Sequence, residues 1–204
     1  MARGRWRDHH RQAAAWWSDR AHTADERFAL ARHRLDAGEY GRAWTDLLAL
    51  VQGWTREGDF RRCGQAVSYL ELAFRQLGIR EDDRRAGELR LHQVRVVRNR
   101  GHIGQAVDEG LVLARAARDN GWDDLGARVL RLTGNALRLS GDLDTAVTML
   151  AAAQQQLKDQ GDTSRILRAT ELLALARVEQ GHPDHGRSLF NQVLAEAVRT
   201  ADTR

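Results

Sequence analysis

The chain has 204 residues, 42% of them apolar, so it can bury a substantial core as one domain or one continuous stack of repeats. One proline and 6% aromatic residues are typical of an all-helical chain. The lone cysteine, Cys63, excludes an intrachain disulfide, and we expect it to be a small buried thiol. No apolar run approaches the roughly 18 residues of a membrane span, so a cytoplasmic location is the default expectation.

The formal charge of +4 is unevenly distributed along the chain, with a net +6 in residues 1–100 and −2 in residues 101–204. Lys158 is the only lysine, so almost all of the positive charge comes from arginine. A mildly basic first half suits an acidic partner, but it lacks the dense basic face that is typical of a nucleic-acid-binding protein.

Residues 1–20 form a basic, tryptophan-containing segment that is either a first helix or a disordered tail. The only apolar run in it, Ala13–Trp17, is too short for the core of a signal peptide. After it, apolar residues recur at helical spacing in a series of segments. The helices expected from this spacing cover residues 24–36, 41–56, 81–100, 101–120, 122–140, 143–160, 163–180 and 183–200. A further helix is expected to open at Gly58-Asp59-Phe60 and to hold Cys63, Val67, Leu70 and Phe74.

Glycines punctuate these segments at positions 38, 58, 78, 101, 121, 141, 161 and 181, in steps of 20 residues apart from the 23-residue step after Gly78. Each step holds a helix of about 17 residues, roughly 25 Å long, and a tight turn. Two steps make a hairpin of about 40 residues, and a single hairpin cannot bury its apolar face alone. The spacing therefore predicts stacked hairpins.

The clearest hairpin runs from Trp122 to Gln160. Gly141 supplies the backbone freedom that ends its first helix, and Asp142 can cap the second. The expected inner stripes are Leu125, Val129, Leu132, Ala136 and Leu139 in the first helix, and Leu143, Ala146, Leu150 and Ala153 in the second.

The turns share a pattern of glycine, polar, apolar, two variable and small residues, as in Gly141-Asp142-Leu143-Asp144-Thr145-Ala146. A small residue also stands seven positions before the glycine, as Gly134 does. Over about residues 24–200 this pattern resembles the tetratricopeptide repeat (TPR), in a variety with helices longer than the usual 34-residue period allows. Such long helices are common in bacterial signalling and transcription-regulator proteins.

The resemblance implies an all-α fold, a right-handed superhelix (α-solenoid) of stacked antiparallel hairpins with nine or ten helices. Residues 21–204 would form a single repeat domain. Counting back from Gly141 makes Gly58 and Gly101 turns within hairpins, whereas the pattern at Gly38 favours the opposite phase; we favour the first.

Proteins of this kind usually hold another protein in the groove lined by their first helices. The face of these helices opposite the buried stripe is rich in arginine, with Arg165 and Glu171 near the equivalent place in residues 163–180. Arg131 and Asn135 have the offsets from the turn glycine of two carboxylate-clamp residues of the family. The expected partner-binding residues are Arg84, Arg95, Arg98, Arg128, Arg131, Asn135, Arg138 and Arg168.

The leading hypothesis is a scaffold or regulatory adaptor that binds an acidic peptide or protein in this groove, because guanidinium groups pair well with carboxylates. The alternatives are binding of nucleic acid or a phosphate ligand, and a self-assembling architectural module. Trp16 and Trp17 are a candidate docking or dimer patch.

No enzyme motif, cofactor site or metal site is predicted from the sequence. The glycines are spread at repeat spacing rather than clustered into a phosphate-binding loop. His182 and His185 lack a third ligand at suitable spacing, and His9 and His10 are interpreted as features of the tail.

Overall fold

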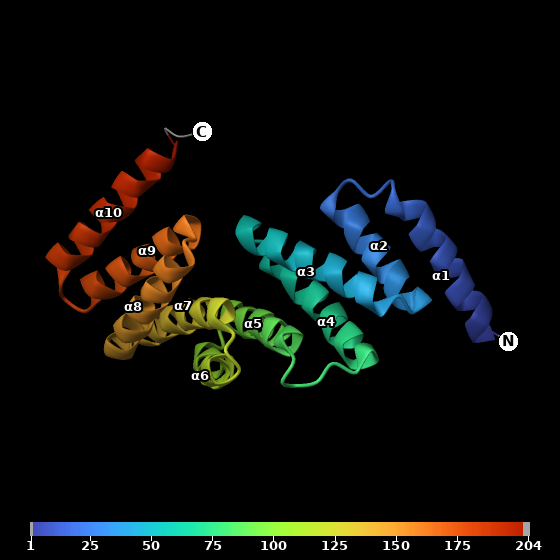
Figure 1. Ribbon diagram of the computed structural model, residues 1–204, viewed down its shortest axis with the longest axis horizontal. Helices are drawn as coiled ribbons and strands as arrows, with labels where there is room; N and C mark the ends of the chain where they lie inside the picture. The colour runs from blue at the N-terminus through green and yellow to red at the C-terminus, as the bar shows by residue number, and fades with distance from the viewer. Residues whose placement is uncertain (1, 202–204) are drawn as a thin grey trace. The chain divides into compact units, whose positions relative to one another are not determined.

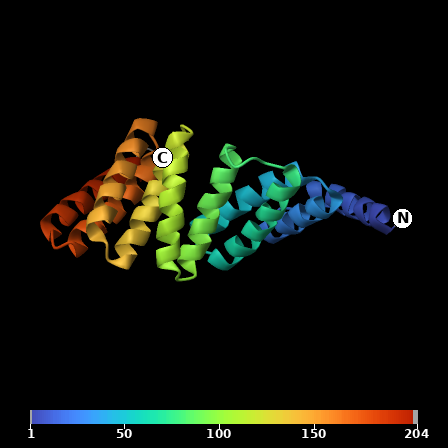
Figure 2. The same ribbon diagram turned by 90° about the horizontal axis from the view of Figure 1, so that it is seen from below.

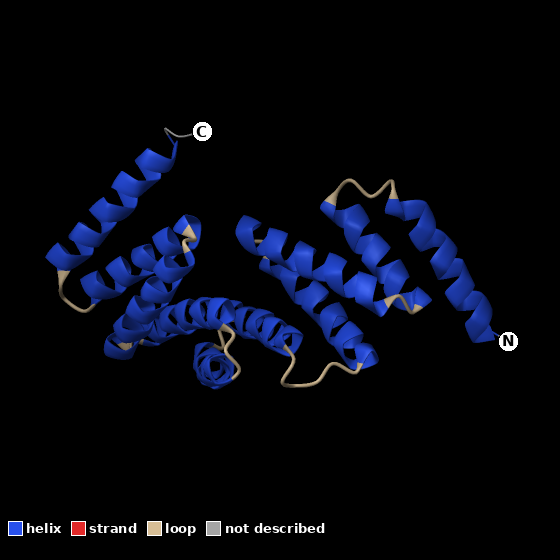
Figure 3. Ribbon diagram, viewed as in Figure 1, coloured by secondary structure: helices blue, strands red, loops and turns tan. Residues whose placement is uncertain are grey.

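The computed structural model describes residues 2–201 and consists there of helices joined by short turns, with no strand in that range (Figures 1 and 3). The prediction of an all-α chain of nine or ten helices is confirmed. The helices are α1 (Ala2–Ser18), α2 (Ala24–Ala37), α3 (Tyr40–Glu57), α4 (Phe60–Leu77), α5 (Arg84–Asn99), α6 (Ile103–Asp119), α7 (Asp123–Ser140), α8 (Leu143–Gln160), α9 (Thr163–Glu179) and α10 (Pro183–Ala201).

The turn between α7 and α8 shows how the sequence ends one helix and begins the next. Gly141 adopts φ 89°, a left-handed conformation, and its N–H bonds to carbonyls of the last turn of α7. The Asp142 side chain accepts a hydrogen bond from the Thr145 N–H at 3.2 Å, which caps α8. The predicted hairpin at Gly141 and Asp142 is therefore present.

Helix α5 begins later than the sequence predicts. We expected residues 81–83 to form an acidic first turn, but the helix starts at Arg84. Asp83 accepts a hydrogen bond from the Arg85 N–H at 2.8 Å, and Asp82 accepts from Arg80 at 2.9 Å. Short acidic side chains that bind local donors favour turns over helix, which explains the difference.

Contacts between residues divide the chain within α5 into two compact units, one up to Val96 and one from Val97 onwards. The division expected from the sequence, a segment of residues 1–20 ahead of one repeat domain of residues 21–204, stays a prediction. In the structure α1 is a helix packed against α2, so residues 2–18 belong to the first unit. The 23-residue glycine step coincides with the longer connection between α4 and α5.

In the first unit each helix from α1 to α4 packs against the next, and in the second unit each helix from α6 to α10 does the same (Figure 2). Helix α3 packs more extensively against α4 than against α2, and α7 more extensively against α8 than against α6. Gly58 and Gly141 therefore lie within hairpins, as in the phase that we favoured, and the place of Gly101 stays a prediction.

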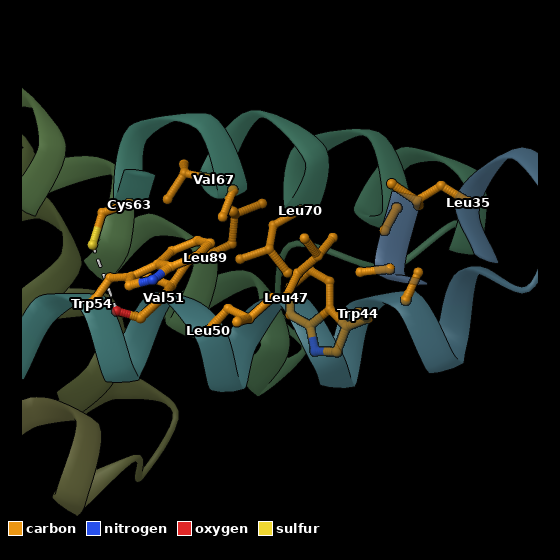
Figure 4. Close-up of a cluster of buried hydrophobic side chains, with 14 of the residues drawn as sticks. Leu35, Trp44, Leu47, Leu50, Val51, Trp54, Cys63, Val67, Leu70 and Leu89 are labelled. Carbon is orange, nitrogen blue, oxygen red and sulfur yellow. Dashed lines mark hydrogen bonds between the residues drawn. The ribbon is translucent and has the colours of Figure 1, made fainter. Parts of the chain in front are cut away.

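The core of the first unit is built by α2, α3, α4 and the start of α5 (Figure 4). Leu47 and Leu70 are fully buried at its centre, and the Trp54 side chain is 1% exposed. Cys63 is buried beside them, and its thiol lies 3.6 Å from the Val51 carbonyl oxygen, to which it donates (Figure 4). Burial raises the pKa of this thiol, as expected of a packing residue rather than a reactive one.

In the second unit the α7 stripe predicted from the sequence is buried at four of its five positions, Leu125, Val129, Leu132 and Ala136. The fifth prediction is wrong, because Leu139 is 51% exposed and Leu137 takes the buried place in the last turn of α7. Leu150 of α8 is fully buried against Leu173 and Ala174 of α9, in a cluster that links three helices.

The first helix also changes the interpretation of the tail histidines. His10 is 9% exposed and its Nδ1 lies 2.8 Å from Nδ1 of His33 on α2. The expectation that His10 is a tail feature is therefore wrong, because α1 packs on α2 and encloses that ring.

None of the helices in the described part of the chain is both long and apolar enough to span a membrane.

Candidate functional site

The exposed face of α7 carries the polar side chains that the sequence singled out. Arg128, Arg131, Asn135 and Arg138 are spaced three, four and three residues apart, which places them along one side of a helix. All four residues are half-buried.

Arg138 fixes how α7 and α9 align. It forms a salt bridge with Glu179 of α9, and its Nε donates to the side-chain oxygen of Asn135 at 3.2 Å. Both partners lie near the C-terminal ends of their helices, so α7 and α9 run in the same direction. Arg131 lies seven residues before Arg138, and Arg168 lies eleven residues before Glu179. These steps are about two and three helical turns, which brings Arg168 within roughly one turn of the level of Arg131.

Local pairs neutralise some of these arginines and leave others uncompensated. Arg165 is held by Asp162, with 3.0 Å between its Nε and the carboxylate, and Arg138 by Glu179. Among the described residues, Arg98 at the end of α5 donates only to the neutral amide of Asn99, at 3.0 and 3.3 Å. Arg131 and Arg168 make no salt bridge with any residue among those the structure describes. We call Arg98, Arg131, Arg168 and Asn135 the arginine surface.

Electrostatics single out Arg131 within this surface. Burial lowers the pKa of its guanidinium to about 10, and the nearby positive charges of Arg168, Arg98, Arg128 and Arg165 add to this shift, in that order. Burial also lowers the pKa of Arg98. Both groups remain protonated at neutral pH, so the chain holds a partly desolvated positive charge among like charges.

Two of the predicted binding arginines belong to the first unit and are bound differently. Arg84 lies 3.8 Å from the carboxylate of Glu88, one turn along α5. Arg95 donates to the Thr55 hydroxyl at 3.3 Å and lies 3.0 Å from Nδ1 of His92. The second unit thus contains Arg98, Arg128, Arg131, Asn135, Arg138 and Arg168 of the predicted set.

We did not predict the two acidic residues, Asp162 and Glu179, that form salt bridges with arginines of this region. Asp162 lies three residues before Arg165 at a helix start, a spacing that could have revealed the pair. Glu179 lies 41 residues after Arg138, which is one residue more than the repeat period of about 40. The repeat period could therefore have revealed this pair as well.

The tryptophan pair lies at the end of α1. Trp16 is 53% exposed, its ring makes an edge contact with Trp17, and the Arg20 guanidinium lies 5.0 Å from its centre. Cation–π contact with Arg20 accounts for part of the arrangement. The docking role of this patch stays a prediction.

Other features lie away from the arginine surface. A cavity of about 310 Å³ between α6, α7 and α8 is lined by Trp122, Gly126 and Leu130, on the side of α7 opposite Arg131. Among the described residues, no three His, Cys, Asp or Glu side chains are arranged to hold a metal ion. His182 and His185 are exposed at the start of α10.

Two solved structures share this arrangement of helices. The crystal structure of BtubC (BKLC) from P. vanneervenii superposes with a TM-score of 0.64 at 12% identity, over 98% of this chain and 93% of that one. A crystal structure of nearly identical TPR-like repeats from a Podospora anserina kinesin light chain gives 0.60 at 14% identity, over 99% of each chain. The protein has a TPR-like helical-repeat fold. The fold that the sequence resemblance implied is confirmed.

The likeness to known proteins extends no further than the fold. No family model matches the chain, and no curated protein matches it. At 12% and 14% identity, side chains of the two TPR-like neighbours give no guide to the residues of this surface.

Proposed function

We propose that this TPR-like protein is an interaction scaffold that binds an acidic segment of a partner protein on the arginine surface of its second unit. The observation that carries this proposal is the absence of salt bridges to Arg131 and Arg168 within the described residues, although acidic residues compensate Arg138 and Arg165 on the same helices. A positive charge that is partly buried without a counter-ion is costly to the folded chain, and an anionic ligand would remove that cost.

A peptide carboxylate suits the groups on this surface. Guanidinium groups bind carboxylates through paired N–H donors, and partial burial strengthens such pairs. Asn135 adds a neutral donor. Its side-chain oxygen accepts a hydrogen bond from Arg138, which leaves its NH2 group to donate to a ligand. Alternating charged and amide donors are suited to an extended segment with acidic side chains and backbone carbonyls.

The test uses a fluorescein-labelled oligoglutamate peptide and fluorescence polarisation with the full chain. Arg131→Glu and Arg168→Glu should each weaken binding by roughly tenfold or more, because each reverses a charge that faces the peptide. Arg115→Glu is the matched control, since Arg115 is an exposed arginine of α6 at the cavity on the other side. Equal affinity for all four proteins would contradict the proposal.

A further inference from the structure

The arginine surface holds more positive charge than one carboxylate can balance. Within the part of the chain that the structure describes, Arg98 has only a neutral amide as its partner, and neither Arg131 nor Arg168 forms a salt bridge. A single carboxylate of charge −1 leaves two of the three guanidiniums uncompensated. The surface therefore favours a ligand group that concentrates negative charge.

The alignment of α7 and α9 allows one group to contact two helices. The Arg138 to Glu179 salt bridge sets the register, and it leaves Arg131 and Arg168 about one turn apart on neighbouring helices. Arginine side chains are long enough to converge from such positions on one anion. The influence of the Arg168 and Arg98 charges on the pKa of Arg131 agrees with this convergence.

A phosphate monoester fits this arrangement better than a carboxylate. It carries about −1.5 to −2 charges at neutral pH and has three strong acceptor oxygens, enough for several guanidinium forks. A nucleotide fits less well, because a base usually stacks on an aromatic ring. The only Phe, Trp or Tyr residues after residue 100 are Trp122 and Phe190. Trp122 lines the cavity on the far side of α7, and Phe190 packs against the core.

We infer that Arg131 and Arg168, with Arg98, bind the phosphate group of a phosphorylated serine or threonine in the partner segment. This inference rests on the proposed function, because it names the group that the arginine surface recognises in an acidic segment. Phosphorylation of the partner would then control its binding, and Asn135 would contact the backbone beside the phosphorylated residue.

Three labelled peptides test the inference against the full chain. They share the sequence Ala-Glu-Ala-Xaa-Ala-Glu-Ala, with phosphoserine, glutamate or serine at Xaa. We expect the phosphoserine peptide to bind roughly tenfold or more tightly than the glutamate peptide. Arg131→Gln and Arg168→Gln should each remove most of this difference, whereas Arg115→Gln should leave it unchanged.

Two further measurements keep the result interpretable. Arg131→Gln removes a partly buried charge that has no counter-ion among the described residues, so its melting temperature by circular dichroism should equal or exceed that of the wild type. Arg168 is exposed, so Arg168→Gln tests the same site without disturbing the packing. Titration with inorganic phosphate measures how well the anion binds without a peptide.

Each outcome decides the question. Equal affinity for the phosphoserine and glutamate peptides would overturn the phosphate inference and leave the acidic-segment proposal standing. Failure of all three peptides and of oligoglutamate would overturn both. Inorganic phosphate that binds as tightly as the phosphoserine peptide would also overturn the inference, because the surface would then recognise a free anion rather than a partner segment.

Discussion

Arg131 shows what burial does to a charged side chain that lacks a partner. Its neighbour Arg138 lies two turns away on the same face and forms a salt bridge with Glu179, whereas the charged groups that act most strongly on Arg131 are four other arginines. A surface arginine with local carboxylates would have a compensated charge, which is the ordinary state of a solvated helix face. The contrast between these two residues distinguishes a candidate binding group from an arginine with a structural role.

The histidine pair between α1 and α2, His10 and His33, should make the stability of the protein depend on pH. His10 and His33 approach each other through their Nδ1 atoms at 2.8 Å, so only one of these two nitrogens can carry the bonding proton. Burial, and then the charge of His10, lowers the pKa of His33, while Asp36 opposes this shift. Arg32 and His9 act in the same direction as burial.

The sign of the pH dependence follows from this shift. In the unfolded chain His33 binds a proton near the ordinary histidine pKa of 6.5, and in the folded chain it binds one only at lower pH. Acidification therefore favours the unfolded state, and stability should fall as the pH drops below about 6.5. Urea unfolding followed by circular dichroism between pH 7.5 and 5.5 measures the effect.

The control for this experiment is His33→Leu, which removes the titrating group. Its free energy of unfolding should change less over the same pH range than that of the wild type. If the two curves ran parallel, His33 would not be a source of the pH dependence, and the contact with His10 would have no energetic consequence at acidic pH.

At the scale of elements, the approach of α7 and α8 depends on Gly134. A Cβ atom at this position would lie 2.8 Å from Leu150 Cγ and 3.3 Å from the Ala146 carbonyl oxygen. Glycine within a helix normally costs about 0.5–1 kcal/mol relative to alanine. Gly134→Ala should nevertheless destabilise the protein by about 1–3 kcal/mol, because the helices must separate or Leu150 must leave its preferred rotamer.

Gly126, in the same helix, is the matched control for Gly134. A Cβ atom there would meet only ordinary contacts, at 3.8 Å from Ala117 Cβ and from the Gln156 side chain. Gly126→Ala should therefore be neutral or stabilising in chemical denaturation. A stabilising effect of both substitutions would show that the close approach at Gly134 is not needed.

The sequence predicts such elements well because their determinants are local or periodic. Gly134 stands seven residues before Gly141, where the resemblance to the tetratricopeptide repeat implies a small residue at a close approach of two helices. The start of α5 is less predictable, since the acidic residues 81–83 are compatible with a helix and their turn depends on bonds to Arg80 and Arg85.

The sequence predicts the arginines of the candidate site but not which of them form salt bridges. Helical spacing finds the arginines, but their compensation depends on contacts such as that of Arg138 with Glu179. The contact of Arg138 with Glu179 follows from how the repeats stack, so the repeat period points to it and no local pattern does, whereas the pair of Asp162 and Arg165 is local.

At the scale of the whole molecule, the two compact units have separate hydrophobic clusters. One cluster joins α2, α3, α4 and the start of α5, with Leu47 fully buried within it. Another joins α8, α9 and α10, with Leu150 fully buried. In repeat proteins each hairpin is stabilised mainly by its nearest neighbours, so a defect in one cluster should weaken the helices around it most.

Leu47→Ala and Leu150→Ala test this directly, because each leaves a cavity in one unit and should cost about 2–5 kcal/mol. Hydrogen exchange measured by mass spectrometry should show lost protection in α2–α4 for Leu47→Ala and in α7–α10 for Leu150→Ala. Loss of protection to the same extent in all helices for both variants would mean that the chain unfolds as one cooperative body. If each substitution instead lowers protection only in its own unit, the first unit can open while the second stays folded. The arginine surface of the second unit would then keep its structure and its ligand.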